Sequence, residues 1–166
     1  LFSFAVVFVV VGLARPQIGA AIKEQGVKGV EIMVALDVSN SMLAEDYYPN
    51  RLERAKLAIS KLVDRLQDDR VGLVVFAGQS FVQLPITTDY VSAKIFLNTI
   101  NTESIPIQGT ALGDAIKTCV KSFSMESENS RAIILITDGE NHEDDPVQAA
   151  KDATTMGARV FCVGVG

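Results

Sequence analysis

The segment VEIMVALDV, residues 30–38, constrains the fold of this chain more than any other part of it. It is apolar at almost every position and rich in β-branched residues, which is typical of a strand buried on both faces. Similar strands are predicted at residues 70–77, 131–139 and 158–166, and amphipathic segments separate them. This alternation predicts a Rossmann-like α/β fold, an open and mainly parallel sheet with helices on both faces.

The amphipathic segments have the spacing of helices. They lie at residues 50–66, 88–100, 110–123 and 145–157. Asn50 and Thr88 stand where N-caps are expected, and each offers a side-chain oxygen to the free N–H groups of a first turn. Thr110 is expected in the first turn or at the cap of its helix. A short third strand is predicted at residues 80–86, and we expect the domain to continue beyond residue 166.

The first 14 residues, LFSFAVVFVVVGLA, are apolar apart from one serine. This length is short of the roughly 20 residues of a membrane span, but the apolar run is open at its left end. We predict a partial transmembrane helix at residues 1–14, a linker at 15–29 and the α/β domain at 30–166, its C-terminal part lying beyond the sequence. A signal-peptide segment and a core strand are the alternatives. The residues present do not say which side of the membrane the domain faces.

Charge and rare residues exclude some classes of function. The net charge is −5 and no basic cluster is present, which argues against a nucleic-acid-binding surface. The two cysteines, Cys119 and Cys162, have no metal-binding spacing and are expected to be small buried residues. His142 is the single histidine, and it lies in an acidic loop.

Oxygen-bearing side chains follow the predicted strands at their carboxyl ends, where open α/β sheets gather functional groups. They are Asp37, Ser39, Ser41, Thr110 and Asp138. None is an imidazole or a thiolate, and two are carboxylates, so the set suits a hard divalent cation, above all Mg²⁺, with Mn²⁺ or Ca²⁺ as substitutes. Taken singly, each residue also fits a turn former or a helix cap.

Three loops carry a resemblance to a known family. DVSNSM, GTALGDAI and LITDGE resemble the loops of the metal-ion-dependent adhesion site (MIDAS) in von Willebrand factor type A domains, and the similarity runs from about Gly29 to Gly166. The segments LARPQIG, SMLAEDYYPNRLERAK, FAGQSFVQLPITTDY and ITDGENHEDD resemble the membrane-anchored Bat (aerotolerance) proteins of bacteria, most of all the BatB type.

The resemblance implies a role for each of the five residues. Ser39, Ser41 and Thr110 would coordinate the metal through their hydroxyls, while Asp37 and Asp138 would act directly or through water. An Asp or Glu of a protein partner would complete the coordination shell. The family further implies a non-enzymatic protein in the bacterial inner membrane, its domain facing the periplasm, that works with other Bat proteins and a MoxR-type AAA+ ATPase.

Other classes of function fit parts of the sequence. A magnesium-dependent phosphohydrolase of the haloacid dehalogenase type would need an acid where Ser39 stands. A serine hydrolase would use GQSFV, but Val82 replaces the closing glycine and the base would have to be His142. A structural or assembly module, its metal only pinning the loops, stays open. Tyr47 and Tyr48 fit either partner contacts or packing beneath the loop, and the acidic loop after Asp138 fits either a charged rim or a solvated connection.

Overall fold

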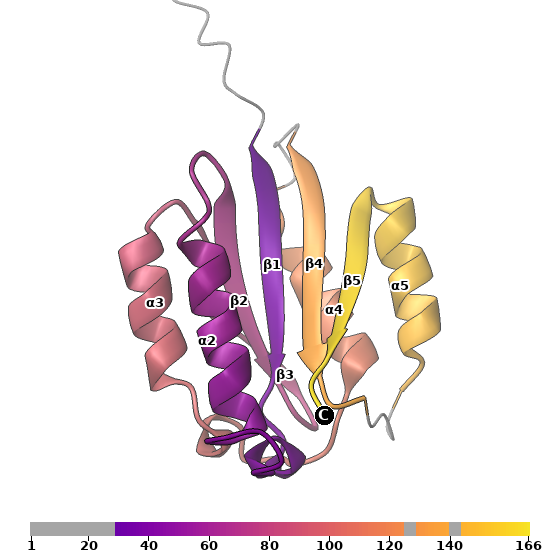
Figure 1. Ribbon diagram of the computed structural model, residues 1–166. Helices are drawn as coiled ribbons and strands as arrows, with labels where there is room; N and C mark the ends of the chain where they lie inside the picture. Colours follow the sequence, from indigo (N-terminus) through magenta and orange to yellow (C-terminus); the bar gives the residue numbers. More distant parts are fainter. Residues whose placement is uncertain (1–28, 125–128, 140–143) are drawn as a thin grey trace, which may run out of the picture.

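The computed structural model describes residues 29–124, 129–139 and 144–166. Its centre is a five-stranded sheet in the order β3-β2-β1-β4-β5 (Figure 1). The strands are β1 (Val30–Asp37), β2 (Arg70–Phe76), β3 (Ser80–Thr87), β4 (Ser130–Thr137) and β5 (Ala158–Gly164). β1, β2, β4 and β5 run parallel, and β3 returns antiparallel to β2 at one edge. The predicted Rossmann-like, mainly parallel sheet is confirmed. The predicted membrane helix at 1–14 lies outside the described residues.

Helices cover both faces of the sheet, as the sequence predicts. They are α2 (Arg51–Val63), α3 (Tyr90–Thr99), α4 (Leu112–Ser122) and α5 (Pro146–Thr155), with two short 3₁₀ helices, η1 (Asn40–Leu43) and η2 (Thr102–Ser104). α2 and α3 lie on one face, and α4 and α5 lie on the other (Figure 1). None of the helices in the described part of the chain has the length and hydrophobicity of a membrane span.

β1 explains why the core has two halves. Its alternate side chains Val34 and Leu36 pack toward α2 and α3, whereas Met33 and Ala35 pack toward α4 and α5. Every residue of β1 after Val30 is buried, as the continuous apolar run predicts. Since β1 is the central strand, its carboxyl end brings Asp37 to the middle of the sheet edge.

The predicted caps of α2 and α3 fall at or next to the observed ones. Asn50 caps α2 as expected, because its Oδ1 accepts the N–H of Glu53 at 2.8 Å. The prediction of Thr88 for α3 is wrong by one residue. Asp89 takes that place, and its carboxylate accepts the N–H of Ser92 at 3.0 Å. A carboxylate also interacts favourably with the positive end of the helix dipole.

Thr110 precedes both the N-cap and the first turn of α4, so that prediction is also wrong. The N-cap residue is Ala111, which has no capping side chain. Asp144, from the loop before α5, accepts the N–H of Asp114 at 2.7 Å and so satisfies the first turn of α4 from outside. The hydroxyl of Thr110 is therefore not needed by the helix, and another role is open to it.

The two cysteines have different surroundings. Cys119 lies on α4 and is buried in the core of the domain, and this burial raises the pKa of its thiol to about 12. Cys162 is exposed on β5, so the prediction that it is buried is wrong. The reason is topological, because β5 is the edge strand of the described sheet.

Candidate metal centre

Asp37 ends β1 and is fully buried. Its Oδ1 accepts the N–H of Ser39 at 2.9 Å, and its Oδ2 accepts the hydroxyl of Thr137 at 2.7 Å. The first bond closes a turn at the point where the strand stops, so Asp37 is also a turn former. Its carboxylate is held in one orientation at the carboxyl edge of the sheet.

The two serines meet directly after this turn. Ser39 has an extended backbone and precedes η1, and its Oγ lies 3.0 Å from the Oγ of Ser41. Met42, a residue of η1, is completely buried and anchors the loop to the core. The spacing of one residue between the serines therefore brings both hydroxyls together.

The loop that carries Thr110 is tied to the same edge by its neighbours. The N–H of Ala111 donates to the carbonyl of Ala77 at the end of β2, at 2.7 Å. The Oε1 of Gln108 accepts the N–H of Asn40 in the first loop, at 3.1 Å. Thr110 itself is buried, and in the described part of the chain its hydroxyl makes no hydrogen bond to the other four predicted residues.

Asp138 follows β4, and its side chain is only 2% exposed. One oxygen, Oδ2, accepts a hydrogen bond from Nη1 of Arg51 at 3.3 Å. The other, Oδ1, is buried and has no hydrogen-bond partner among the described residues. A buried carboxylate oxygen without a partner is costly, and bound ions are among the usual reasons for one.

The electrostatics of Asp37 point the same way. Burial raises the pKa of Asp37, and the negative charge of Asp138 raises it further. Hydrogen bonds from Ser39 and Thr137 offset only part of this effect. A cation beside the two carboxylates would offset the burial and the repulsion that destabilise the charged form of Asp37.

The residues therefore fit a hard divalent cation. Hydrogen bonds join Asp37, Ser39 and Ser41. Asp138 is close enough for its charge to raise the pKa of Asp37. Hydrogen bonds of the loop that carries Thr110 hold that loop at the same edge of the sheet. The described residues contain no group of three or more His, Cys, Asp and Glu side chains that could hold a metal. A site here depends on the hydroxyls as well as on the two carboxylates.

Sequence reasoning missed two residues that touch the site. Thr137 donates to Asp37, and it could have been noticed as a hydroxyl next to Asp138 in ITDG. Arg51 donates to Asp138 across 87 residues of sequence, and no local pattern indicates that contact. In the sequence it is only a charged residue at the start of a helix.

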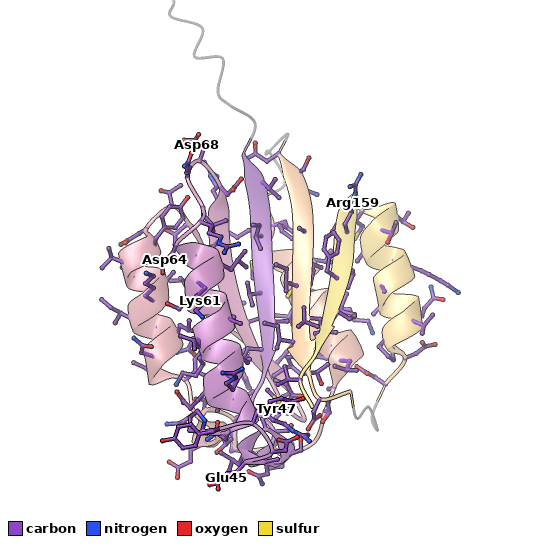
Figure 2. The ribbon with its side chains drawn as sticks, in the orientation of Figure 1. Glu45, Tyr47, Lys61, Asp64, Asp68 and Arg159 are labelled. Atoms are coloured by element: carbon purple, nitrogen blue, oxygen red, sulfur yellow. The ribbon has the colours of Figure 1, made fainter. Side chains whose placement is uncertain are left out.

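The segment that follows the two serines exposes several large side chains. Tyr47 and Tyr48 are 46% and 90% exposed, so the alternative in which one of them packs beneath the loop is wrong. Leu43, at the end of η1, is also 46% exposed. Figure 2 shows Glu45 and Tyr47 at the end of the molecule where the loops gather, opposite Asp68 and Arg159. His142 and most of the acidic loop lie outside the described residues.

Ser80, the nucleophile of the serine-hydrolase alternative, has other partners. Its hydroxyl donates to the Asp114 carboxylate at 2.6 Å and lies 2.7 Å from the Thr118 hydroxyl. These contacts fix the start of β3 against α4. Within the described residues, Ser80 is therefore engaged in structural hydrogen bonds.

A glycine controls how closely the loop of Thr110 approaches β2. The N–H of Gly78 donates to the carbonyl of Ile107 at 3.0 Å, and a Cβ at Gly78 would lie 2.6 Å from the carbonyl oxygen of Gln108. Gly78→Ala is expected to push this loop outward, costing about 1–3 kcal/mol of stability and weakening Mg²⁺ binding. Thermal unfolding and calorimetric titration measure the two effects.

Gly164→Ala is the matched control, because a Cβ there meets nothing within 4 Å. It should leave stability and Mg²⁺ affinity nearly unchanged. If Gly78→Ala behaved like this control, the close approach of the two loops would have no part in the site.

The chain is similar to proteins of known family and structure. A family model for the von Willebrand factor type A domain matches residues 32–140. Two solved structures are 56% identical to the chain, each with a TM-score of 0.80. One is an aerotolerance-related membrane protein from Bacteroides fragilis, and the match covers 83% of this chain and 68% of that one. The other is BatB from Bacteroides thetaiotaomicron, with 82% and 66% covered.

More distant relatives share the fold. Proximal thread matrix protein 1 of the mussel byssus is 22% identical with a TM-score of 0.71, over 82% of this chain and 35% of that protein. Its MIDAS motif is occupied by zinc, and at this identity the likeness concerns the fold alone. Curated bacterial relatives are 27–31% identical, and the chain spans less than half of their length. The predicted resemblance to Bat proteins of the BatB type is confirmed, and the chain belongs to the von Willebrand factor type A domain family.

Proposed function

We propose that this chain is a non-enzymatic, membrane-anchored interaction domain that binds a carboxylate of a protein partner through a Mg²⁺ site. The metal ligands would be Asp37, Ser39, Ser41, Thr110 and Asp138. The observation that carries the proposal is Oδ1 of Asp138, a buried carboxylate oxygen without a hydrogen-bond partner among the described residues. A cation at this place would compensate it.

The proposed ligands would have different roles at the metal. The Ser39 and Ser41 hydroxyls, 3.0 Å apart, would act as neutral ligands, and the buried Asp37 would supply charge from below. When bound, the cation supplies a positive charge that a carboxylate from outside can ligate. Because the loops exclude water on the protein side, that charge interaction is stronger than in bulk water.

The donor set favours magnesium over softer ions. All five proposed ligands offer oxygen, and Mg²⁺ prefers oxygen, keeps several waters and pairs with one or two carboxylates. Mn²⁺ and Ca²⁺ can occupy oxygen sites and are the proposed substitutes. Zinc favours nitrogen and sulfur ligands, which the proposed ligand set lacks.

A protein partner fits the surroundings better than a small molecule does. The segment that follows the metal loop exposes three large side chains at its surface, Leu43, Tyr47 and Tyr48. Tyrosine is enriched in protein interfaces because it buries a large area and keeps a polar end. The partner would place an acidic side chain at the metal and apolar side chains on this surface.

The cellular setting is proposed from the relatives. The Bacteroides fragilis relative is an aerotolerance-related membrane protein. We place this domain in the bacterial inner membrane by analogy, anchored through residues 1–14 and facing the periplasm. Other Bat proteins and a MoxR-type AAA+ ATPase are the proposed functional associates. An assembly role, in which the metal only pins the loops, is the alternative.

Calorimetric titration with Mg²⁺ tests the metal site. We expect saturable binding by the wild-type chain and none by the variant Ser39→Ala/Ser41→Ala, because two of the three hydroxyl ligands are then absent. Ser60→Ala on α2 is the control and should bind as the wild type does. Equal binding by all three proteins would contradict the proposed ligands.

A second measurement separates adhesion from assembly. If the metal only pins the loops, chelation lowers the melting temperature without changing any association of the protein. If the metal binds a partner's carboxylate, chelation also abolishes that association.

A further inference from the structure

Arg51, the first residue of α2, places its guanidinium between two carboxylates. Its Nε and Nη2 donate to Asp46 at 2.9 and 2.7 Å, and its Nη1 donates to Oδ2 of Asp138 at 3.3 Å. Asp46 is 40% exposed, whereas Asp138 is 2% exposed. A positive charge therefore lies against a buried proposed metal ligand and is held from the solvent side by a second acid.

This arginine is fixed at both ends. Its backbone N–H donates to the carbonyl of Ala44 at 3.1 Å, which attaches the start of α2 to the chain after η1. The two bonds to Asp46 form a fork, a geometry that arginine provides and lysine does not. The hydrogen bond from Arg51 lowers the pKa of Asp46, and that carboxylate raises the pKa of Arg51. Both groups stay charged.

The charges decide what the site attracts. Asp37 and Asp138 together carry −2, and Arg51 cancels one of these charges. Asp46 adds one negative charge, so the four side chains total −2, and a bound divalent cation brings the site to about neutral. A cation near the site repels the metal and attracts an incoming carboxylate, so its effects on the two ligands have opposite signs.

We infer that Arg51 shifts the affinities of the site for its two ligands in opposite directions. Its charge weakens metal binding and strengthens the binding of a carboxylate to the metal-loaded domain. The inference rests on the proposed function and adds to it the residue that sets the balance between metal and partner. An arginine that only oriented Asp138 would act differently. Its loss would disorder that carboxylate and weaken the binding of both ligands.

The experiment titrates Mg²⁺ into the wild-type chain, Arg51→Gln and Arg51→Lys, with acetate as the carboxylate probe. Each titration is done in chloride and again in acetate at equal ionic strength. We expect Arg51→Gln to bind Mg²⁺ about tenfold more tightly than the wild type in chloride, the order of effect of one nearby charge. Acetate should tighten Mg²⁺ binding by the wild type and have a clearly smaller effect on Arg51→Gln.

Two controls keep the result interpretable. Arg51→Lys retains the charge without the fork, and it should bind both ligands nearly as the wild type does. Arg54→Gln removes an exposed arginine one turn later on α2 and should change neither affinity. Thermal unfolding of every variant confirms that each protein is folded before its affinities are compared.

Each outcome has one meaning. Mg²⁺ binding by Arg51→Gln that is equal to or weaker than that of the wild type overturns the inference, while the proposed metal site stands. An undiminished acetate effect in Arg51→Gln overturns it as well. A wild-type chain that binds no Mg²⁺ contradicts the proposed function itself.

Discussion

Replacing Asp37 with asparagine is expected to lower Mg²⁺ affinity by about 100-fold or more while the domain stays folded. Substituting a residue that only hydrogen-bonds to a metal ligand typically lowers metal affinity by about 10- to 100-fold. Asp37→Asn removes the charge of a residue that is itself a proposed ligand. The amide keeps the shape of the carboxylate, and its oxygen can still accept the N–H of Ser39. The hydroxyl of Thr137 can rotate to accept from the new amide nitrogen.

Asparagine is a sharper probe here than alanine. Alanine would leave the Ser39 N–H and the Thr137 hydroxyl without their buried acceptor, which costs about 1–3 kcal/mol for each group. Loss of metal binding would then be mixed with loss of the loop. Burial raises the pKa of Asp37 because it destabilises the charged carboxylate. Asparagine carries no charge, so the metal-free variant should be no less stable than the wild type.

Calorimetric titration and thermal unfolding measure the two halves of this prediction. Glu45→Gln is the control, because Glu45 is an exposed acid near the same loop (Figure 2). It should bind Mg²⁺ with nearly the wild-type affinity. An Asp37→Asn protein with unchanged Mg²⁺ affinity would remove Asp37 from the metal site.

The strands could be predicted because burial on both faces leaves a plain trace in the sequence. Every residue of β1 after Val30 is buried, and the apolar run at residues 30–38 reports this directly. Helix caps are harder, since several residues near a helix start can serve. Asp89 caps α3 in place of the neighbouring Thr88, and Asp144 satisfies α4 from a loop 30 residues away.

The candidate site divides in the same way between local and distant interactions. The turn of Asp37 and the convergence of Ser39 and Ser41 are local, so their spacing predicts them. The contact between Arg51 and Asp138 joins the start of a helix to the end of a strand, and only the packed fold creates it. The sequence thus predicts which groups could bind a metal, but not the charge that surrounds them.

The same dependence on packing appears beneath the site, at Phe76. It ends β2, is fully buried, and pairs in register with Asp37, and its carbonyl accepts the N–H of Val38 at 2.9 Å. Its side chain belongs to the core between the sheet and α4. Phe76→Ala is expected to cost about 3–5 kcal/mol of unfolding free energy through the cavity it leaves. This is a large part of the roughly 5–15 kcal/mol that stabilises a typical domain.

Urea unfolding with and without Mg²⁺ tests this prediction, with Phe81→Ala as the matched control. Phe81 is 47% exposed on β3, so its loss should cost far less. Equal costs for the two substitutions would contradict the buried position of Phe76. At about 100 times its dissociation constant, Mg²⁺ should add about 2.7 kcal/mol to any protein whose site is intact. If Phe76→Ala gains less than this, the cavity has loosened the Asp37 turn, and the core beneath the site helps to shape its metal affinity.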